Sequence, residues 1–275
     1  MKKSFLVYFI LLIFSLLPIR CFAQFTAKEL AQRAQWEEFL TSADIINYEQ
    51  MWGSQAITNP FKITLQKDSA TRNALLKNIE GRLGGHWECW KFEIAAYLLD
   101  KYLELNMVPP TVERNFQGKR SSCQLWVEYE MSLRSKMQNN VAMPTYKVFH
   151  WNRATYLQRA FDNLIANIDR HAGNILITKD WRMILIDHSR TFRTSKKFAN
   201  ELIYTDKHEG GAKEMKQLPR AFVEKIESLN YELIKEIVGD YLTDDEINAL
   251  LARKELILKE IKRLTKKYGE DKVLY

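Results

Sequence analysis

The chain has 275 residues, of which 46% are hydrophobic and 27% are charged, with a formal net charge of +7 at pH 7. This apolar content is enough for a sizeable core, and the length suits one domain built from two parts. The positive charge is spread along the chain, so it does not favour nucleic-acid binding, which needs a concentrated basic face. No internal repeat or low-complexity segment is visible, which excludes a solenoid or a low-complexity protein.

Residues 1–23 are predicted to be a secretory signal peptide. Lys2 and Lys3 form a positive start, residues 5–17 are apolar, and small residues stand near the end. The apolar run is short for a membrane-spanning helix, although an uncleaved anchor is the alternative. Cleavage would remove these lysines and Arg20 and lower the formal charge from +7 to +4. We therefore expect an exported protein, periplasmic or secreted, with no transmembrane span in the mature chain.

The cysteines leave two interpretations open. Cys21 would be removed with the signal peptide, so Cys89 and Cys123 would stay in the mature chain. An oxidising compartment would allow them to form one disulfide. Two buried thiols are an equally good interpretation, because the sequence does not supply the distance between the two side chains.

The first part of the chain is predicted to contain a helical lead-in and a hairpin. Residues 24–51 form the lead-in, because the segment is polar and its apolar residues recur at helical spacing. Residues 61–65 and 74–77 are predicted strands around a turn at residues 66–69. The second of these strands ends on Lys77.

A long amphipathic helix is predicted over residues 87–105, whose aromatic and aliphatic residues recur at helical spacing. Glu93 lies on the flank of that apolar stripe. Pro109 and Pro110 end the helical pattern and start an extended segment. A short apolar strand is expected at residues 124–127.

The second half of the chain is predicted to be mostly helical. Residues 148–166 carry an apolar stripe, and residues 218–237 and 243–267 are two further amphipathic stretches. The last stretch opens with a capping box that begins at Thr243. Arg253 on that helix is a candidate to reach the central motif.

The most informative stretch follows the helix at residues 148–166. Asp169 is followed five positions later by Asn174, and Asp187 closes the second of two short apolar strands. An acid, an amide, a hairpin and a second acid is the order of a kinase catalytic loop and metal-binding segment. One carboxylate could take the proton of an attacking hydroxyl, while the amide and the second carboxylate could bind Mg²⁺. A chance arrangement on a loop is the ordinary alternative.

These motifs carry a resemblance to known kinases. The loop Asp169-Arg170-His171-Ala172-Gly173-Asn174 resembles the Asp-Arg-His-x-x-Asn loop of atypical, phosphoinositide 3- and 4-kinase-like enzymes. Residues 167–171 and residues 93–114 are similar to the secretory-pathway kinases of the Golgi casein kinase type. The second motif, Asp187-His188-Ser189, departs from the Asp-Phe-Gly of common protein kinases and lacks its glycine. His188 has no Cys or His at metal-ligand spacing and is predicted to be structural.

The resemblance implies an α+β, two-lobed protein-kinase-like fold. Its small mixed lobe would span residues 52–130, and its mostly helical large lobe would span residues 131–275. The implied activity is transfer of phosphate from ATP to an acceptor. Asp169 would be the general base, and Asn174 and Asp187 would bind Mg²⁺ or Mn²⁺.

In the small lobe, the resemblance implies that Lys77 contacts the nucleotide phosphates and that Glu93 orients this lysine. Gly53 and Ser54 would form part of the phosphate-facing loop, although no G-x-G-x-x-G motif occurs. Glu88 is the alternative to Glu93. The lysines that compete with Lys77 for this role are Lys62, Lys67 and Lys91.

A basic run, Arg190, Arg193, Lys196 and Lys197, comes soon after Asp187. In a kinase-like fold this segment faces the acceptor, so the run favours an anionic acceptor, whether protein, sugar or lipid headgroup. A solvated basic face is the ordinary alternative.

Two other functions fit the same residues. One is nucleotidyl transfer on the same fold, because a fold does not determine its chemistry. The other is a pseudokinase that serves as a binding module. Retention of Asp169, Asn174 and Asp187 argues against the pseudokinase, whereas the scarcity of ATP outside a bacterial cytoplasm argues for it.

Overall fold

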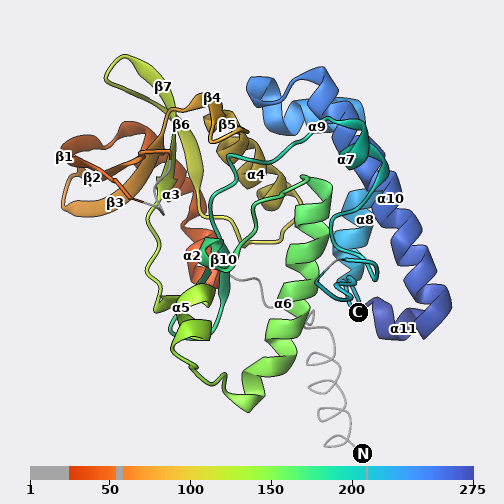
Figure 1. The fold of residues 1–275 in the computed structure, drawn as a ribbon. Coiled ribbons are helices and arrows are strands. Elements are labelled where there is room, and N and C mark those ends of the chain that lie inside the picture. Colours follow the sequence, from red (N-terminus) through yellow and green to blue (C-terminus); the bar gives the residue numbers. More distant parts are fainter. Residues whose placement is uncertain (1–24, 54–57, 209) are drawn as a thin grey trace, which may run out of the picture.

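The computed structural model describes residues 25–53, 58–208 and 210–275, which form an α+β arrangement with antiparallel sheets. Figure 1 shows the strands of the large sheet on the left, with the helices α6 (Thr145–Leu164), α8 (Arg220–Ser228) and α10 (Asp244–Tyr268) to the right of them. The predicted signal peptide, residues 1–23, lies outside the described residues. Within the described ranges, no helix combines the length and the apolar character needed to cross a membrane.

The largest sheet has five antiparallel strands in the order β1-β2-β3-β7-β6. They are β1 (Asp44–Gln50), β2 (Phe61–Lys67), β3 (Ala70–Lys77), β6 (Thr111–Phe116) and β7 (Lys119–Leu125). Ile63 and Leu65 alternate along β2 toward one face of the sheet. There they pack in one core with Phe39 and Leu40 of α3 (Arg33–Ser42). The predicted hairpin that ends on Lys77 is confirmed, but its turn is shorter than predicted and its second strand begins at Ala70 instead of residue 74.

The helical lead-in predicted for residues 24–51 is only partly correct. The helices α2 (Ala27–Ala31) and α3 are present, but Asp44–Gln50 is the edge strand β1, paired with β2. Most residues of β1 are exposed, as is common in an edge strand, so it lacks the apolar alternation that would reveal a strand. The sheet consequently begins before residue 52, the predicted start of the small lobe.

The helix predicted for residues 87–105 begins too early. His86–Cys89 is strand β5, which pairs with β4 (Glu80–Leu83), and the helix α4 covers Trp90–Tyr102. Gly84 and Gly85 connect the two strands with φ values of 57° and 82°, the left-handed conformation that a two-residue hairpin turn requires. α4 contacts β6 and β7 of the sheet and also α9 (Tyr231–Val238), so it joins the sheet to the helices.

The second half of the chain is mostly helical, as predicted. Its helices are α5 (Leu133–Gln138), α6 (Thr145–Leu164), α7 (Lys196–Asn200), α8 (Arg220–Ser228), α9 (Tyr231–Val238), α10 (Asp244–Tyr268) and α11 (Glu270–Val273), with short 3₁₀ turns η1 (Ala172–Asn174) and η2 (Gly239–Tyr241). One core joins α4, α6, α8, α9 and α10. The capping box at Thr243 is confirmed.

The amphipathic stretch predicted for residues 218–237 is in fact two helices. Leu229 has extended backbone and ends α8, and Asn230 begins α9. The Asn230 side-chain oxygen accepts a hydrogen bond from Leu233 N at 2.8 Å. This N-cap marks the start of a separate helix, because it satisfies a free N–H group of the first turn.

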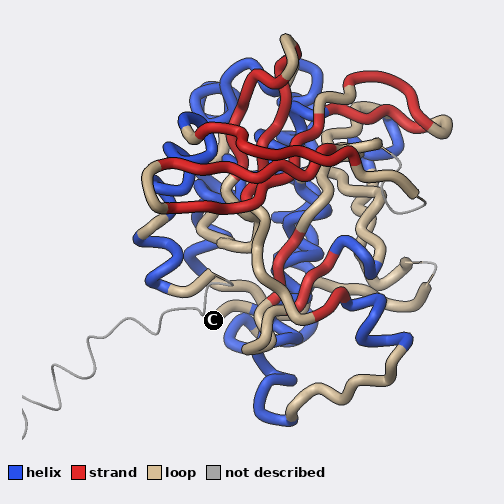
Figure 2. Tube along the Cα trace, turned by 90° about the vertical axis from the view of Figure 1, so that its left-hand side faces the viewer, coloured by secondary structure: helices blue, strands red, loops and turns tan. Residues whose placement is uncertain are grey.

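A small sheet carries the central motif. Its strands β8 (Met131–Ser132), β9 (Ile175–Ile177) and β10 (Met183–Leu185) lie in the order β10-β9-β8. Figure 2 shows them below the strands of the large sheet. The predicted β9–β10 hairpin is confirmed, with Met183 opposite Ile177. At its open end Ile186 N donates to Asn174 O at 3.2 Å, so the loop before β9 meets the segment after β10.

The two cysteines do not form a disulfide. Cys89 and Cys123 are both free and buried. Burial raises the pKa of the Cys89 thiol to about 11 and that of Cys123 to about 12. The second interpretation, two buried thiols, is the correct one.

Candidate functional site

The site is organised around a buried lysine between two carboxylates. Lys77 stands at the end of β3, and its Nζ lies 2.6 Å from Glu93 Oε1 and 2.6 Å from Asp187 Oδ1. Glu93 lies in the first turn of α4 and is 2% exposed, whereas Asp187 follows β10 and its side chain is 35% exposed. The large sheet, the helix α4 and the small sheet therefore each contribute one charged group to this cluster.

Geometry decides between the candidates that the sequence left open. Lys77 is the lysine that meets Glu93. The competing lysines Lys62, Lys67 and Lys91 pair instead with Glu49, Glu38 and Glu80, respectively. Glu88 is also buried, but its carboxylate binds Ser189 and Arg190.

The three groups keep one another charged. Burial disfavours the Lys77 ammonium, but attraction by Asp187 and Glu93 outweighs it and raises the pKa of Lys77 above its ordinary value. Burial also disfavours the Glu93 carboxylate, but Lys77 and then His188 hold the pKa of Glu93 well below its usual range. In the same way Lys77 lowers the pKa of Asp187 against the effects of burial and of Glu93. One ammonium and two carboxylates leave the cluster with a net charge of −1, which suits a cation.

Asp187 is held in an unusual backbone conformation. Its φ is +62°, in the left-handed region that residues other than glycine rarely adopt. Both flanking residues are fixed: Ile186 O accepts from Arg170 Nη1 at 2.7 Å, and His188 N donates to Glu93 Oε2 at 3.0 Å. Such a conformation costs about 1–3 kcal/mol and persists only where the surroundings impose it.

His188 and Arg170 contact each other beside the Asp187-His188-Ser189 motif. Arg170 pairs with the buried Asp162 at 3.0 Å, and its Nη2 lies 2.8 Å from His188 Nε2. Burial lowers the pKa of His188, so the ring is neutral at pH 7. Because arginine can only donate, Nε2 is the acceptor and the ring hydrogen is on Nδ1, which faces Glu93 Oε2 at 3.6 Å. This arrangement agrees with the structural role predicted for His188.

Asp169 and Asn174 lie together in the loop before β9. Asp169 N donates to Asn167 Oδ1 at 3.1 Å, and Asn174 Nδ2 donates to the Asp169 carbonyl at 3.2 Å. The Asp169 carboxylate is partly exposed and lies 3.2 Å from Arg190 Nη1. The loop therefore holds the acid and the amide near the segment that follows Asp187.

The sequence did not reveal the pair of Glu88 and Arg190. Glu88 on β5 is 1% exposed; it accepts from Arg190 Nε and, at 2.5 Å, from Ser189 Oγ. Cys89 N also donates to Ser189 O at 3.0 Å, so β5 fastens the segment after Asp187. Arg190 thus bridges Glu88 and Asp169. No local signal could reveal this contact, because it joins residues 102 positions apart.

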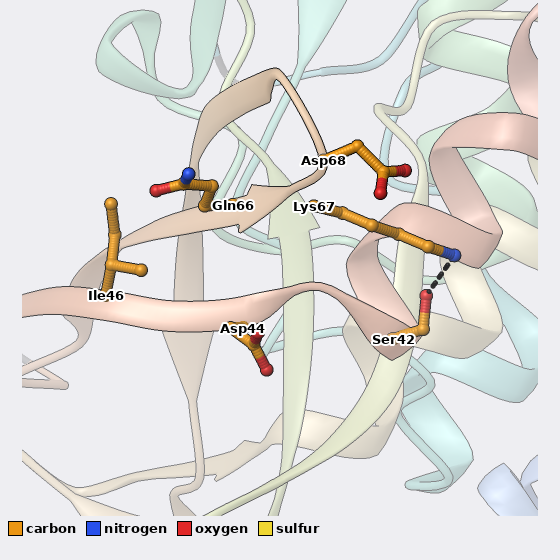
Figure 3. Close-up of a pocket in the computed structure, with 6 residues that line it drawn as sticks. All are labelled: Ser42, Asp44, Ile46, Gln66, Lys67 and Asp68. Carbon is orange, nitrogen blue, oxygen red and sulfur yellow. Dashed lines mark hydrogen bonds between the residues drawn. The ribbon is translucent and has the colours of Figure 1, made fainter.

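Of the two residues predicted for the phosphate-facing loop, only Gly53 lies among the described residues, and no described contact joins it to this cluster. Ser54 lies outside the described residues. Gly53 follows β1 with a φ of 121°. At the other end of β1, Figure 3 shows a shallow hollow in which Lys67 bonds Ser42 Oγ at 2.9 Å. Lys67 also binds Glu38, so its charge is already matched, and this hollow offers little to a ligand.

The predicted metal ligands fit the chemistry of Mg²⁺ or Mn²⁺. Asp187 and Asn174 supply a carboxylate and an amide oxygen, the hard donors that these ions take, and the remaining positions are usually filled by water and phosphate oxygens. Within the described ranges no group of three or more His, Cys, Asp or Glu side chains forms a metal site.

The comparisons with known proteins add no relative. No family model matches the chain, and no curated protein matches it. A function must therefore be argued from the site itself. The site offers an ammonium held between two carboxylates and, separately, a partly exposed carboxylate beside a guanidinium.

Proposed function

We propose that the chain is an atypical kinase that transfers phosphate from Mg·ATP to an acceptor hydroxyl. The observation that carries this proposal is the cluster of Lys77, Glu93 and Asp187, with both distances from Lys77 Nζ at 2.6 Å. A strand lysine, a helix glutamate and a metal-binding acid after a hairpin are the elements that position ATP in kinases. The resemblance of the 169–174 loop leads to the same proposal independently.

The proposed fold has the two lobes of a protein kinase. The five-stranded sheet and α4 would be the small lobe, extended by β1 beyond the boundary at residue 52. The chain from residue 131 onward would be the large lobe, and residues 126–130 would connect the two. The exported location is a proposal too, resting on residues 1–23.

Each group has a distinct part in the proposed reaction. Lys77 would hold the phosphates, since its ammonium has three hydrogens and only two are used by Glu93 and Asp187. Asp169 would take the proton of the acceptor hydroxyl. The acceptor oxygen then bonds to the γ-phosphorus, the bond from that phosphorus to the β–γ bridging oxygen breaks, and ADP leaves. Mg²⁺ held by Asn174 and Asp187 would offset the charge of the transferring group.

Labelled ATP separates this reaction from its alternatives. With γ-labelled ATP, a kinase transfers label to itself or to an acceptor, whereas nucleotidyl transfer requires label from the α position. Binding of Mg·ATP with transfer of neither label would instead indicate a pseudokinase.

Two variants test the roles of the acids. We expect Asp187→Asn to abolish metal-dependent ATP binding in a thermal-shift titration. Asp169→Asn should still bind ATP, but its rate of phosphate transfer should fall about 10²–10⁴-fold, which is the usual contribution of a general base. Asp68→Asn, in the exposed turn after β2, is the matched control and should behave like the wild type. If Asp187→Asn binds Mg·ATP as well as the wild type does, the metal assignment is wrong.

A further inference from the structure

A hollow of about 750 Å³ lies beside the proposed catalytic loop. One side is Ile168, which directly precedes Asp169, and the rest comes from α7 and the segment after it, residues 197–208. Pockets of roughly 300–1,000 Å³ hold small molecules. Since Ile168 directly precedes the proposed general base in the chain, the hollow borders the proposed catalytic loop next to Asp169.

The lining combines apolar and cationic side chains. Ile168, Phe198, Leu202 and Ile203 offer apolar surface. Lys197 and Lys207 are exposed cations on the same lining, and neither forms an ion pair within the part of the chain that the structure describes. Two unmatched ammonium groups beside apolar side chains fit a molecule with an anionic group and a carbon skeleton.

The lining also has groups that can bind hydroxyls. Among the described residues that line the hollow, Glu201 is the only acid, so the lining has one more lysine than acid. Glu201 and Thr205 can each accept a hydrogen bond from a hydroxyl. The lining therefore suits an anion that also carries hydroxyls.

The four cations of the basic run that was expected to face the acceptor have different surroundings in the structure. Arg190 binds Glu88 and Asp169. Arg193 donates to the backbone carbonyls of Arg190 at 3.2 Å and of Trp87 at 3.3 Å. Of the four cations in the run, Lys197 alone is on the lining of the hollow, and Lys207 joins it from further along the chain.

We propose that this hollow is the acceptor site, and that the acceptor is a small hydroxylated molecule with a phosphate or carboxylate on a partly apolar body. The proposal rests on the kinase activity proposed above, because the hydroxyl of this molecule would give its proton to Asp169 and receive the phosphoryl group. Lys197 and Lys207 would bind the anionic group, and the apolar side chains would cover the carbon skeleton. The size of the hollow favours a small molecule over an extended peptide.

Two probes with a phosphate next to hydroxyls test the site and its source of ligand. Free glycerol 3-phosphate is measured by calorimetry. Vesicles of phosphatidylglycerol are measured by cosedimentation, with phosphatidylcholine vesicles as the blank. Neither measurement includes ATP. We expect the wild type to bind one probe, and the probe that binds shows whether the source is a free metabolite or a lipid headgroup.

Matched lysine variants test the lining itself. The double variant Lys197→Ala with Lys207→Ala should weaken binding of that probe by about tenfold or more, because two charge-assisted contacts are lost. Lys196→Ala removes a neighbouring exposed lysine that is not on the lining, so it should bind like the wild type. Both changes are at exposed positions, and equal melting temperatures would verify that the fold is intact.

The outcomes separate the acceptor site from the kinase activity. Transfer of phosphate to the bound probe, with KM raised in the double variant and kcat retained, supports the acceptor site. Binding of neither probe, or equal binding by the double variant and the wild type, overturns it. A parallel titration with Mg·ATP tests the kinase proposal separately, since failure to bind Mg·ATP overturns that proposal whatever the probes do.

Discussion

Lys77 illustrates how a charge can be kept inside a protein. Burying an unpaired ammonium costs several kcal/mol, and the contacts to Glu93 and Asp187 offset this cost. The same contacts make the three groups interdependent, because removal of Lys77 would leave two neighbouring carboxylates without their counter-ion. The effects of changing these residues should therefore not add.

A double-mutant cycle measures this dependence. Lys77→Met and Glu93→Gln should each destabilise the protein to urea, and the double variant should lose less than the sum. We expect a coupling of about 1–3 kcal/mol, as for residues in one buried ionic network. The control cycle combines Lys77→Met with Glu88→Gln instead of Glu93→Gln. Because Glu88 binds Ser189 and Arg190, its coupling to Lys77 should be weaker. Additive losses in the first cycle would mean that Lys77 and Glu93 do not interact in solution.

At the scale of elements, α4 is the helix that links the two halves of the site. Its first turn carries Glu93, and its last turn carries the fully buried Asp100. Asp100 Oδ1 accepts from Met107 N at 2.9 Å and from Val108 N at 3.1 Å, which fixes the chain after the helix. No hydrogen bond reaches its Oδ2 among the described residues. Burial outweighs the backbone bonds and raises the pKa of Asp100 to about 7.

This raised pKa predicts how stability depends on pH. Asp100 titrates near 3.8 when unfolded and near 7 when folded, so the folded protein binds more protons between these values. Stability should therefore fall as pH rises through this window, by up to about 1.4 kcal/mol per pH unit from this residue. Asp100→Asn keeps an acceptor for Met107 N and Val108 N but cannot ionise, so this decline should be absent. Urea unfolding from about pH 5 to about pH 8 measures the difference.

Asp68→Asn, at an exposed turn, is the control for this measurement and should follow the wild-type curve. The same decline in stability in Asp100→Asn and in the wild type would show that Asp100 is ionised throughout the window.

At the scale of the whole molecule, Arg253 joins three segments that are far apart in the chain. It lies on α10 and is buried, with Nε donating to Leu164 O at 2.7 Å and Nη1 donating to Arg193 O at 2.8 Å. Leu164 ends α6 just before the proposed catalytic loop, and Arg193 follows the proposed metal-binding motif, Asp187-His188-Ser189. Burial lowers the pKa of Arg253 to about 10. The candidate contact between this arginine and the central motif is therefore made through backbone carbonyls.

Replacement of Arg253 should loosen this junction. Arg253→Met removes a buried hydrogen bond to Leu164 O and a partly buried one to Arg193 O, so we expect a loss of about 2–4 kcal/mol in the free energy of unfolding. Arg220→Met is the control: Arg220 is exposed and pairs with Glu270 at the surface, so its loss should be much smaller. Denaturant titration of both variants provides the comparison. Equal losses would assign no special role to the carbonyls that Arg253 binds.

The sequence by itself determined the features that depend on near neighbours. The β9–β10 hairpin, the capping box at Thr243 and the order of Asp169, Asn174 and Asp187 follow from alternation, turn chemistry and spacing over a few residues. The strands β1 and β5 were missed because neither has the apolar alternation of a half-buried strand. Each adopts the strand conformation because a neighbouring strand pairs with it, and its own sequence pattern does not indicate a strand.

Only the tertiary structure decided which charged groups meet. The choice of Glu93 over Glu88 for Lys77, and of Glu88 for Arg190, involves contacts between residues 16 and 102 positions apart. The contact of Lys77 with Asp187 spans 110 positions. Such contacts depend on strand register, on the rotation of α4 about its axis and on the packing of one sheet against another. A local pattern carries no information on these quantities, because it shows which face of an element is apolar and not which distant group that face meets.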